Sequence, residues 1–358
     1  MARPEFIEDL IPLILDADND HWWPTHLATL ATVSSAWLFY VRKRLYSYPH
    51  IYDLGAGAKL ADTLKAHAEL KSLVRGISLR VSPNGRPFHD THLKALRVLL
   101  GLEGLKYITL GGKLVASQYL KLISEPDDVE NIHIDGSNYC GSPNQIPISS
   151  PVFEWDEAFG FGFPNLQTLR LTHVDLHIEV PRTLYPTTIT HLILEHVTLR
   201  PGTIQHLLNG APTLTCLHLT CSDPVEEELR MVLSSCGIRC LHYQVQKATC
   251  SDPFTDVDPS DGEALRCLHL DGPILDDGML NTICFTFRNL EELIVMGRTV
   301  RIPAQGWVDL ISSDSKLLSL RRLGFPWGTN IPPFTVWSTE EMQMVCDACI
   351  GRQIDLIL

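Results

Sequence analysis

The 358-residue sequence lacks any long apolar run. No stretch of about 18 consecutive apolar residues occurs, so no membrane-spanning helix is predicted. The first residues, MARPEFIEDLIP, have no basic segment ahead of an apolar one, which argues against a secretory signal. There is no Asn-x-Ser/Thr sequon, and the ten cysteines show no disulfide-framework spacing. Several cysteines fall on apolar positions of the sequence, which predicts buried thiols. The missing signal segment, sequon and disulfide spacing predict that these thiols are reduced, in a protein of the cytoplasm or the nucleus.

Basic residues are also few. Lysine and arginine number 29 against 42 acidic residues, which gives a net charge of −13. An acidic chain is a poor partner for nucleic-acid phosphates or an anionic membrane surface, so we expect neither as a partner. The hydrophobic fraction of 45% and charged fraction of 20% indicate a folded rather than a disordered chain.

Signatures of catalysis are missing as well. The sequence has no H-E-x-x-H, no phosphate-binding P-loop and no G-x-S-x-G. Cys346 and Cys349 have the spacing of a redox motif, but they fall in a helical pattern without a flanking βαβ unit, which favours two small buried residues. We therefore predict no enzyme, no catalytic residue, no cofactor and no metal site. A small hydrolase would need a nucleophile motif that the sequence does not contain.

What the sequence does contain is a repeat. Residues 163–176, FPNLQTLRLTHVDL, follow the pattern L-x-x-L-x-L-x-x-Φ-x-L, where Φ is apolar. The L-x-L part alternates apolar and polar residues, which is typical of a short strand with one buried face. One such strand cannot bury its apolar face alone, so it requires neighbouring copies of itself.

Copies of this pattern occur along most of the chain. The shorter core L-x-x-L-x-L recurs with a mean spacing of about 27 residues, within the range of leucine-rich repeats. The ten units begin at Val74, Leu105, Val129, Leu166, Ile189, Leu214, Ile238, Leu265, Leu290 and Leu320. This periodicity predicts an α/β leucine-rich-repeat solenoid, with parallel strands on the concave face and helices on the convex face. The ninth repeat position, commonly Asn or Cys, is usually another residue here, so we expect an irregular solenoid.

Residues 4–51 differ from the repeats. Apolar residues at helical spacing predict a first helix that is short or kinked at Pro12. Pro24 suits the first position of a second helix, and Ser34 or Ser35 suits the N-cap of a third. Three helices in about 45 residues are only marginally stable without a neighbouring surface.

This three-helix segment resembles an F-box. The family pattern has an opening Leu-Pro-x-Glu, an apolar helix, a Val-Ser-x-x-Trp that begins a later helix, and an apolar end. The matching residues, assigned to the F-box core or to adaptor binding, are Pro4, Glu5, Phe6, Ile7, Leu10, Ile11, Leu27, Leu30, Val33, Trp37 and Leu45. Followed by irregular leucine-rich repeats, the segment is similar to the large F-box families of mushroom-forming fungi. One departure is Ala2-Arg3 in place of the opening Leu-Pro, which in the family helps to contact the adaptor.

The resemblance implies an organisation and a function. It divides the chain into an F-box-like three-helix domain (1–54), a connecting helix (55–72) and an irregular leucine-rich-repeat solenoid (73–358). It implies a substrate-recognition adaptor of a Skp-cullin-F-box ubiquitin ligase. The first domain would bind a Skp-type adaptor and, through it, a cullin, and the repeats would bind a substrate protein. The alternative is an interaction scaffold without a ligase role, whose three helices only cap the solenoid.

Candidate substrate-binding residues lie on the strands and in two loops. Histidines and a glutamate at polar strand positions are expected to face a partner, and histidine would make the surface charge depend on pH between about 6 and 7. A long insertion, residues 136–164, and a later loop carry aromatic residues that could anchor a partner, although those in the insertion could instead pack onto the solenoid. The candidates are His191, Glu195, His218, His242, Trp155 and Trp327.

Overall fold

The computed structural model describes residues 10–17, 24–81, 88–137, 150–183, 187–208, 213–249, 252–297, 300–313, 315–327 and 336–357. The fold is α/β. Its parallel sheet has twelve strands in the order β1-β2-β3-β4-β6-β8-β10-β11-β12-β13-β14-β15, and a second sheet has the order β5-β7-β9. The chain divides into two compact units, Met1–Ile132 and His133–Leu358. None of the helices in the described ranges is long and apolar enough to cross a bilayer.

The first unit includes three helices, α1 (Leu10–Ala17), α2 (Pro24–Leu30) and α3 (Ser35–Ser47). The hydroxyl of Ser34 accepts a hydrogen bond from the Trp37 backbone N–H and caps α3, as one of the two expected serines. The buried core of these helices consists of Ile11, Leu15, Leu27 and Val41, and the partly buried Leu30 and Trp37 pack against it. The predicted residues Pro4, Glu5, Phe6 and Ile7 lie outside the described residues, as does the Ala2-Arg3 departure.

The remainder of the first unit already has the repeat architecture. Its elements are β1 (His50–Ile51), α4 (Leu54–Ala66), α5 (Ala68–Lys71), β2 (Gly76–Val81), α6 (Asp90–Leu100), β3 (Tyr107–Gly112), and the 3₁₀ helices η1 (Ser117–Leu122) and η2 (Pro126–Asp128). Ile77 pairs with Ile108 and Leu79 with Leu110 in parallel register. Strand β1 also pairs with β2, and α4 packs against α6, so these elements belong to the same compact unit.

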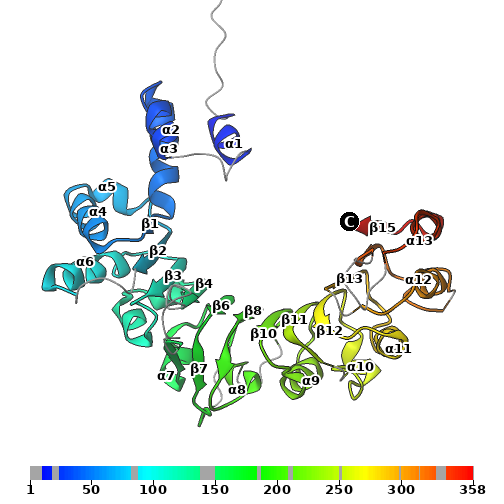
Figure 1. Cartoon of the computed structure of the whole chain (residues 1–358). Coiled ribbons are helices and arrows are strands. Elements are labelled where there is room, and N and C mark those ends of the chain that lie inside the picture. Colours follow the sequence, from blue (N-terminus) through cyan, green and yellow to red (C-terminus); the bar gives the residue numbers. More distant parts are fainter. Residues whose placement is uncertain are drawn as a thin grey trace, which may run out of the picture. The chain divides into compact units, whose positions relative to one another are not determined.

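The strand β4 (Asn131–Asp135) spans the boundary, and the second unit then alternates strands and helices. Its elements are β5 (Val152–Trp155), α7 (Glu157–Gly162), β6 (Thr168–Thr172), β7 (Asp175–Ile178), β8 (His191–Glu195), β9 (Thr198–Leu199), α8 (Ile204–Leu208), β10 (Cys216–Cys221), α9 (Glu226–Ser235), β11 (Cys240–Thr249), α10 (Pro259–Gly262), β12 (Cys267–Pro273), α11 (Asp277–Thr286), β13 (Glu292–Met296), α12 (Ala304–Ile311), β14 (Arg322–Gly324), α13 (Thr339–Arg352) and β15 (Asp355–Ile357). Helices α9 to α13 run along one side of strands β10 to β13 (Figure 1).

The leucines of the repeat pair in register across this unit. The second leucine of each repeat unit is fully buried and lies beside the same leucine of the next strand. From β6 to β14 these residues are Leu169, Leu192, Leu217, Leu241, Leu268, Leu293 and Leu323, and the half-buried Leu356 continues the alignment on β15. Register follows from the pattern because a slip by one residue would turn every leucine to the other face of the sheet. The predicted parallel α/β architecture is therefore confirmed, and the spacing of the repeats sets the pairing of these strands.

The insertion between β4 and β6 forms its own layer. Its strand β5 pairs with β7, which carries the eleventh position of the repeat, Leu176, and β7 pairs with β9. The aromatic rings pack together: Phe159 lies 5.7 Å from Phe153, 4.5 Å from Trp155 and 4.7 Å from Phe163, measured between ring centroids. Trp155 is only 2% exposed, so it is a core residue. This agrees with the alternative in which the aromatic residues of the insertion pack onto the solenoid, and not with the selection of Trp155 as a partner-binding residue.

Candidate functional site

The sheet of the second unit has one face that is not covered by leucines. Side chains alternate along a strand, so the residues between the buried leucines point to the opposite side, here called the open face. Because the strands are in register, the open-face residues form rows across the sheet. The central row, from β6 to β13, is Arg170, Ile193, His218, His242, His269 and Ile294.

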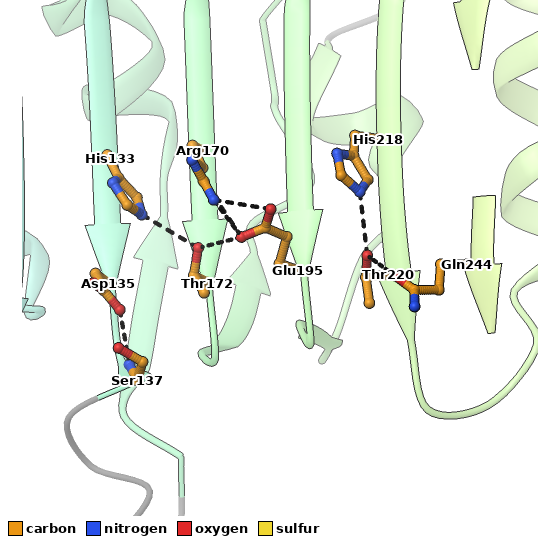
Figure 2. A network of polar contacts seen from close by, with 9 residues as sticks. All are labelled: His133, Asp135, Ser137, Arg170, Thr172, Glu195, His218, Thr220 and Gln244. Carbon is orange, nitrogen blue, oxygen red and sulfur yellow. Dashed lines mark hydrogen bonds and ion pairs between the residues drawn. The ribbon is translucent and has the colours of Figure 1, made fainter. Parts of the chain in front are cut away.

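At one side of this face an ion pair is fixed by a neighbouring hydroxyl. Arg170 donates through Nη2 to both carboxylate oxygens of Glu195, at 2.9 and 2.8 Å, and Thr172 donates to Glu195 Oε2 at 3.1 Å (Figure 2). The Thr172 hydroxyl also lies 3.2 Å from Nε2 of His133 on β4. Burial disfavours the Glu195 carboxylate, but the hydrogen bonds and positive charge of Arg170 outweigh it, and the pKa of Glu195 is lowered. Glu195 is therefore a fixed anion, held in a two-pronged contact.

The hydrogen bonds continue on β10 to β12. Nε2 of His218 lies 3.3 Å from the Thr220 hydroxyl, which also lies 3.3 Å from Oε1 of Gln244 (Figure 2). The amide of Gln244 in turn donates to Asp271 at 3.1 Å. His218 is the fifth residue of its repeat unit, and Thr220, Gln244 and Asp271 are each the seventh residue of theirs. The periodicity therefore builds a connected polar surface rather than isolated polar residues.

Three histidines stand side by side in the centre. The ring centroid of His242 lies 5.2 Å from that of His218 and 3.9 Å from that of His269. His269 contacts Glu292, which also forms an ion pair with Arg322. We define the polar row as Arg170, Glu195, His218, His242, His269, Glu292 and Arg322. It places three imidazoles between two Arg–Glu pairs.

The environment of His218 favours the neutral imidazole. Burial lowers its pKa, and the nearby His242 lowers it further, whereas Glu195 acts in the opposite direction. A proton on His218 would be attracted by Glu195 but repelled by Arg170 and by the other imidazoles. The charge of the row at His218 therefore depends on pH.

Cysteines precede these histidines at the same repeat position. The triplet Cys-Leu-His occurs at 216–218, 240–242 and 267–269, and all three cysteines are free and half-buried on the open face. They are not in the apolar core positions that the sequence suggested, in contrast to the buried Cys221, Cys236, Cys284 and Cys349. A hydrogen bond with Cys240 lowers the pKa of Cys216. Within the described residues, no group of three or more His, Cys, Asp or Glu side chains is arranged to hold a metal ion.

The structure brings together three of the predicted surface residues, Glu195, His218 and His242. His191 is exposed on the same face, one row away from them. Trp327 lies apart from the row, in an aromatic cluster with Phe325 and Trp337 at 5.4 and 5.8 Å. The sequence-based selection missed Arg170, His269, Glu292 and Arg322. The repeat pattern could have identified these four residues, because they occupy the same polar positions beside the leucines as the histidines that were chosen.

A second exposed feature lies on the three helices of the first unit. Of the predicted F-box residues, Ile11 and Leu27 are buried, whereas Leu10, Val33 and Leu45 are exposed. Leu13 on α1 and Phe39 on α3 add further exposed apolar area, with Leu13 64% exposed. Large exposed apolar side chains concentrated on a small domain are typical of an interaction surface.

No protein-family model matches the chain, and no curated protein is significantly similar to it. The resemblance of the three helices to an F-box therefore rests on the residues quoted above.

Proposed function

We propose that this protein is a substrate-recognition adaptor of a Skp-cullin-F-box ubiquitin ligase, acting in the cytoplasm or the nucleus. Helices α1 to α3 would form the F-box and bind the Skp-type adaptor, and the leucine-rich-repeat sheet would bind a substrate protein. No residue of the chain performs chemistry in this proposal. Two binding surfaces on one chain raise the effective concentration of substrate near a conjugating enzyme.

The observation that carries the proposal is the division of apolar residues in the three helices. Ile11, Leu15, Leu27 and Val41 form a core, yet Leu13, Val33 and Phe39 remain mostly in water. Burial of apolar surface stabilises a protein by roughly 25 cal/mol per Å². The three helices lack this stabilisation for the side chains that remain exposed, although a domain of this size is only marginally stable. A partner that covers them would recover this stabilisation, as expected for an F-box on its adaptor.

The polar row supports the second half of the proposal. Hydrogen bonds hold the Arg170–Glu195 pair in place, and Glu292 contacts both His269 and Arg322. Polar side chains that are already held in place give specificity to a protein interface at little entropic cost. Its imidazoles accept or donate hydrogen bonds according to their protonation state. We expect the substrate to cross several strands, since the row crosses them too.

The test is co-purification of the full chain with a Skp-type adaptor. The variant Leu13→Glu places a charge in the exposed apolar surface of the helices, and Leu318→Glu is the matched control, because Leu318 is 66% exposed in the second unit. We expect a stoichiometric complex with the wild type and with Leu318→Glu, and loss of the complex with Leu13→Glu. Circular dichroism should show the same helix content in all three proteins.

The competing proposal is an interaction scaffold without a ligase role. It is favoured by the replacement of the family's Leu-Pro with Ala2-Arg3. Absence of a complex with the folded wild-type protein would select this scaffold and reject the ubiquitin role. A complex that survives Leu13→Glu unchanged would reject the docking surface proposed for the three helices.

A further inference from the structure

A pocket of about 370 Å³ lies beside the polar row, where strands β8 and β10 end. Its lining comes from the loops that follow these strands and from the first turns of α8 and α9. The volume falls within the range of about 300–1,000 Å³ that is common for small-molecule sites. Thr220, which belongs to the hydrogen-bonded surface of the open face, also lines this pocket. Neither the proposed F-box role nor the polar row explains why a cavity should be present here.

The walls of the pocket combine aliphatic side chains with polar ones, among them His196, Thr198 and Ser222. Leu194, Leu219 and Ile204 are buried side chains that line it, and Val197, Leu199 and Val225 complete the apolar surface. The backbone beside the pocket is constrained at Gly202, which has φ +89°. A Cβ added at Gly202 would lie 2.6 Å from the Ile178 carbonyl oxygen. The shape of the pocket is therefore set by packed strands and a turn that requires glycine.

One half-buried carboxylate faces this apolar surface. Oε2 of Glu228 accepts a hydrogen bond from the Ile204 backbone N–H at 2.9 Å, which fixes the side chain at the wall. Among the described residues Glu228 has no ion-pair partner, whereas the other acid of the pocket, Asp223, contacts Lys247 at 2.5 Å. Burial raises the pKa of Glu228, opposed by the Ile204 N–H and by His206, and the neighbouring Glu227 raises it further. A carboxylate in a cleft with this combination of burial and missing counter-charge is characteristic of a binding site.

We propose that the pocket binds an amphipathic ammonium: a primary amine on a short alkyl or arylalkyl body. The ammonium would pair with Glu228, and the body would lie against Leu194, Leu219 and Ile204. The geometry selects this class because the site offers one uncompensated anion, Glu228, beside a group of aliphatic side chains. An anion would be repelled by Glu228, and a neutral alcohol would leave Glu228 without its counter-charge. The inference does not depend on the ubiquitin ligase role.

The ammonium could belong to a free small molecule or to a lysine side chain of a bound protein. Both have the same chemistry at Glu228, and they differ in what surrounds the alkyl chain. Two probes separate them: n-hexylamine represents the free amine, and Nα-acetyl-lysine amide represents the lysine side chain. Hexanoate and n-hexanol share the apolar body without the positive charge, so they report on burial of the chain alone.

The experiment is calorimetric titration of the full chain with these probes at neutral pH. The test variant is Glu228→Gln, which keeps an oxygen to accept from Ile204 and removes the charge. Glu227→Gln is the matched control, since Glu227 is an exposed acid in the same turn of α9. We expect saturable binding of hexylamine that Glu228→Gln weakens at least about tenfold, in line with the loss of a charged hydrogen bond, and that Glu227→Gln leaves within about twofold.

The probe Nα-acetyl-lysine amide, whose side-chain ammonium is free, separates the two sources of the ammonium. If it binds as tightly as hexylamine, a partner's lysine is the natural occupant, and if only hexylamine binds, a free amine is. Equal binding of hexanol, equal affinity in Glu228→Gln, or no saturable binding of either amine up to about 10 mM would overturn the proposal. Unchanged thermal unfolding of both variants would show that a loss of binding is not a loss of fold.

Discussion

The three N-terminal helices and the repeat strands use leucine in different ways. In the helices a few apolar residues are buried, and several others, among them Leu13 and Val33, remain exposed. In the strands the aligned leucines, such as Leu217 and Leu241, are fully buried, and the residues between them are polar. The helices therefore leave apolar surface for another molecule, whereas each strand buries its apolar face with help from its neighbours.

This difference shows which surface of each region is free to act. A repeat strand satisfies its leucines inside the fold, so what remains for a partner is its polar face. A small helical domain cannot enclose all its apolar residues, so what remains for a partner is apolar. This difference is what leads us to propose two different partners for the two regions.

The largest effect that we predict is in the repeat core. Leu293→Ala on β13 removes a fully buried side chain that lies between the leucines of two neighbouring strands, and should cost about 4 kcal/mol of unfolding free energy. Met296→Ala, on the same strand but 52% exposed, is the control and should cost less than about 1 kcal/mol. Urea denaturation followed by circular dichroism measures both. Equal losses would mean that burial does not distinguish the two faces of β13.

The next effect is at a backbone position. Gly272 has φ +96°, and an added Cβ would lie 1.8 Å from the Val245 carbonyl oxygen, so Gly272→Ala should cost about 3 kcal/mol. Gly351 lies in helix α13 with no neighbouring atom within 4 Å of its Cβ position. Gly351→Ala should therefore stabilise the protein by about 0.5–1 kcal/mol. Thermal unfolding distinguishes the two variants by the sign of the shift, and a stabilising Gly272→Ala would contradict the register between β11 and β12.

A smaller effect is expected in the three helices. Leu27→Ala opens a cavity in a core to which the described residues contribute four buried side chains. Such a small core can collapse around the cavity, so the substitution should cost about 2 kcal/mol locally. Hydrogen exchange should accelerate at amides of α2 and α3 and stay unchanged at amides of β10 to β13. Exchange that accelerates in the strands as well would show that the helices and the repeats unfold together, and the comparison above would then fail.

The sequence was sufficient to predict the parallel α/β architecture and the alignment of its strands, because the leucine spacing dictates both. It was not sufficient to show that Trp155 is buried, since an aromatic residue in an insertion has the same pattern whether it packs inward or outward. It identified His218 and His242 but missed His269, which occupies the same position two residues after a cysteine. The pocket could not have been predicted, because Leu194 and Glu228 come from separate elements and only folding brings them together.

The smallest effect concerns pH and belongs to the polar row of the repeats. The imidazole of His218 titrates near pH 6.5 in the unfolded chain, and burial, His242, His269 and Arg170 lower its pKa in the folded protein, against the opposing charge of Glu195. Between the two pKa values the unfolded chain binds a proton that the folded protein does not, so stability falls as the pH drops below about 6.5 and is unaffected above it.

The variant His218→Gln should reduce this loss of stability, and the measurement is the urea midpoint at about pH 7.5 and about pH 5.5. Other histidines, including His173, have lowered pKa values too, so the pH dependence should become shallower without disappearing. Thr220→Val is the control, because it removes the hydroxyl next to His218 and keeps the imidazole. It should retain the wild-type difference between the two midpoints. A steeper dependence in His218→Gln would mean that Glu195, rather than burial, dominates at this position, and that the centre of the row is charged in the folded protein.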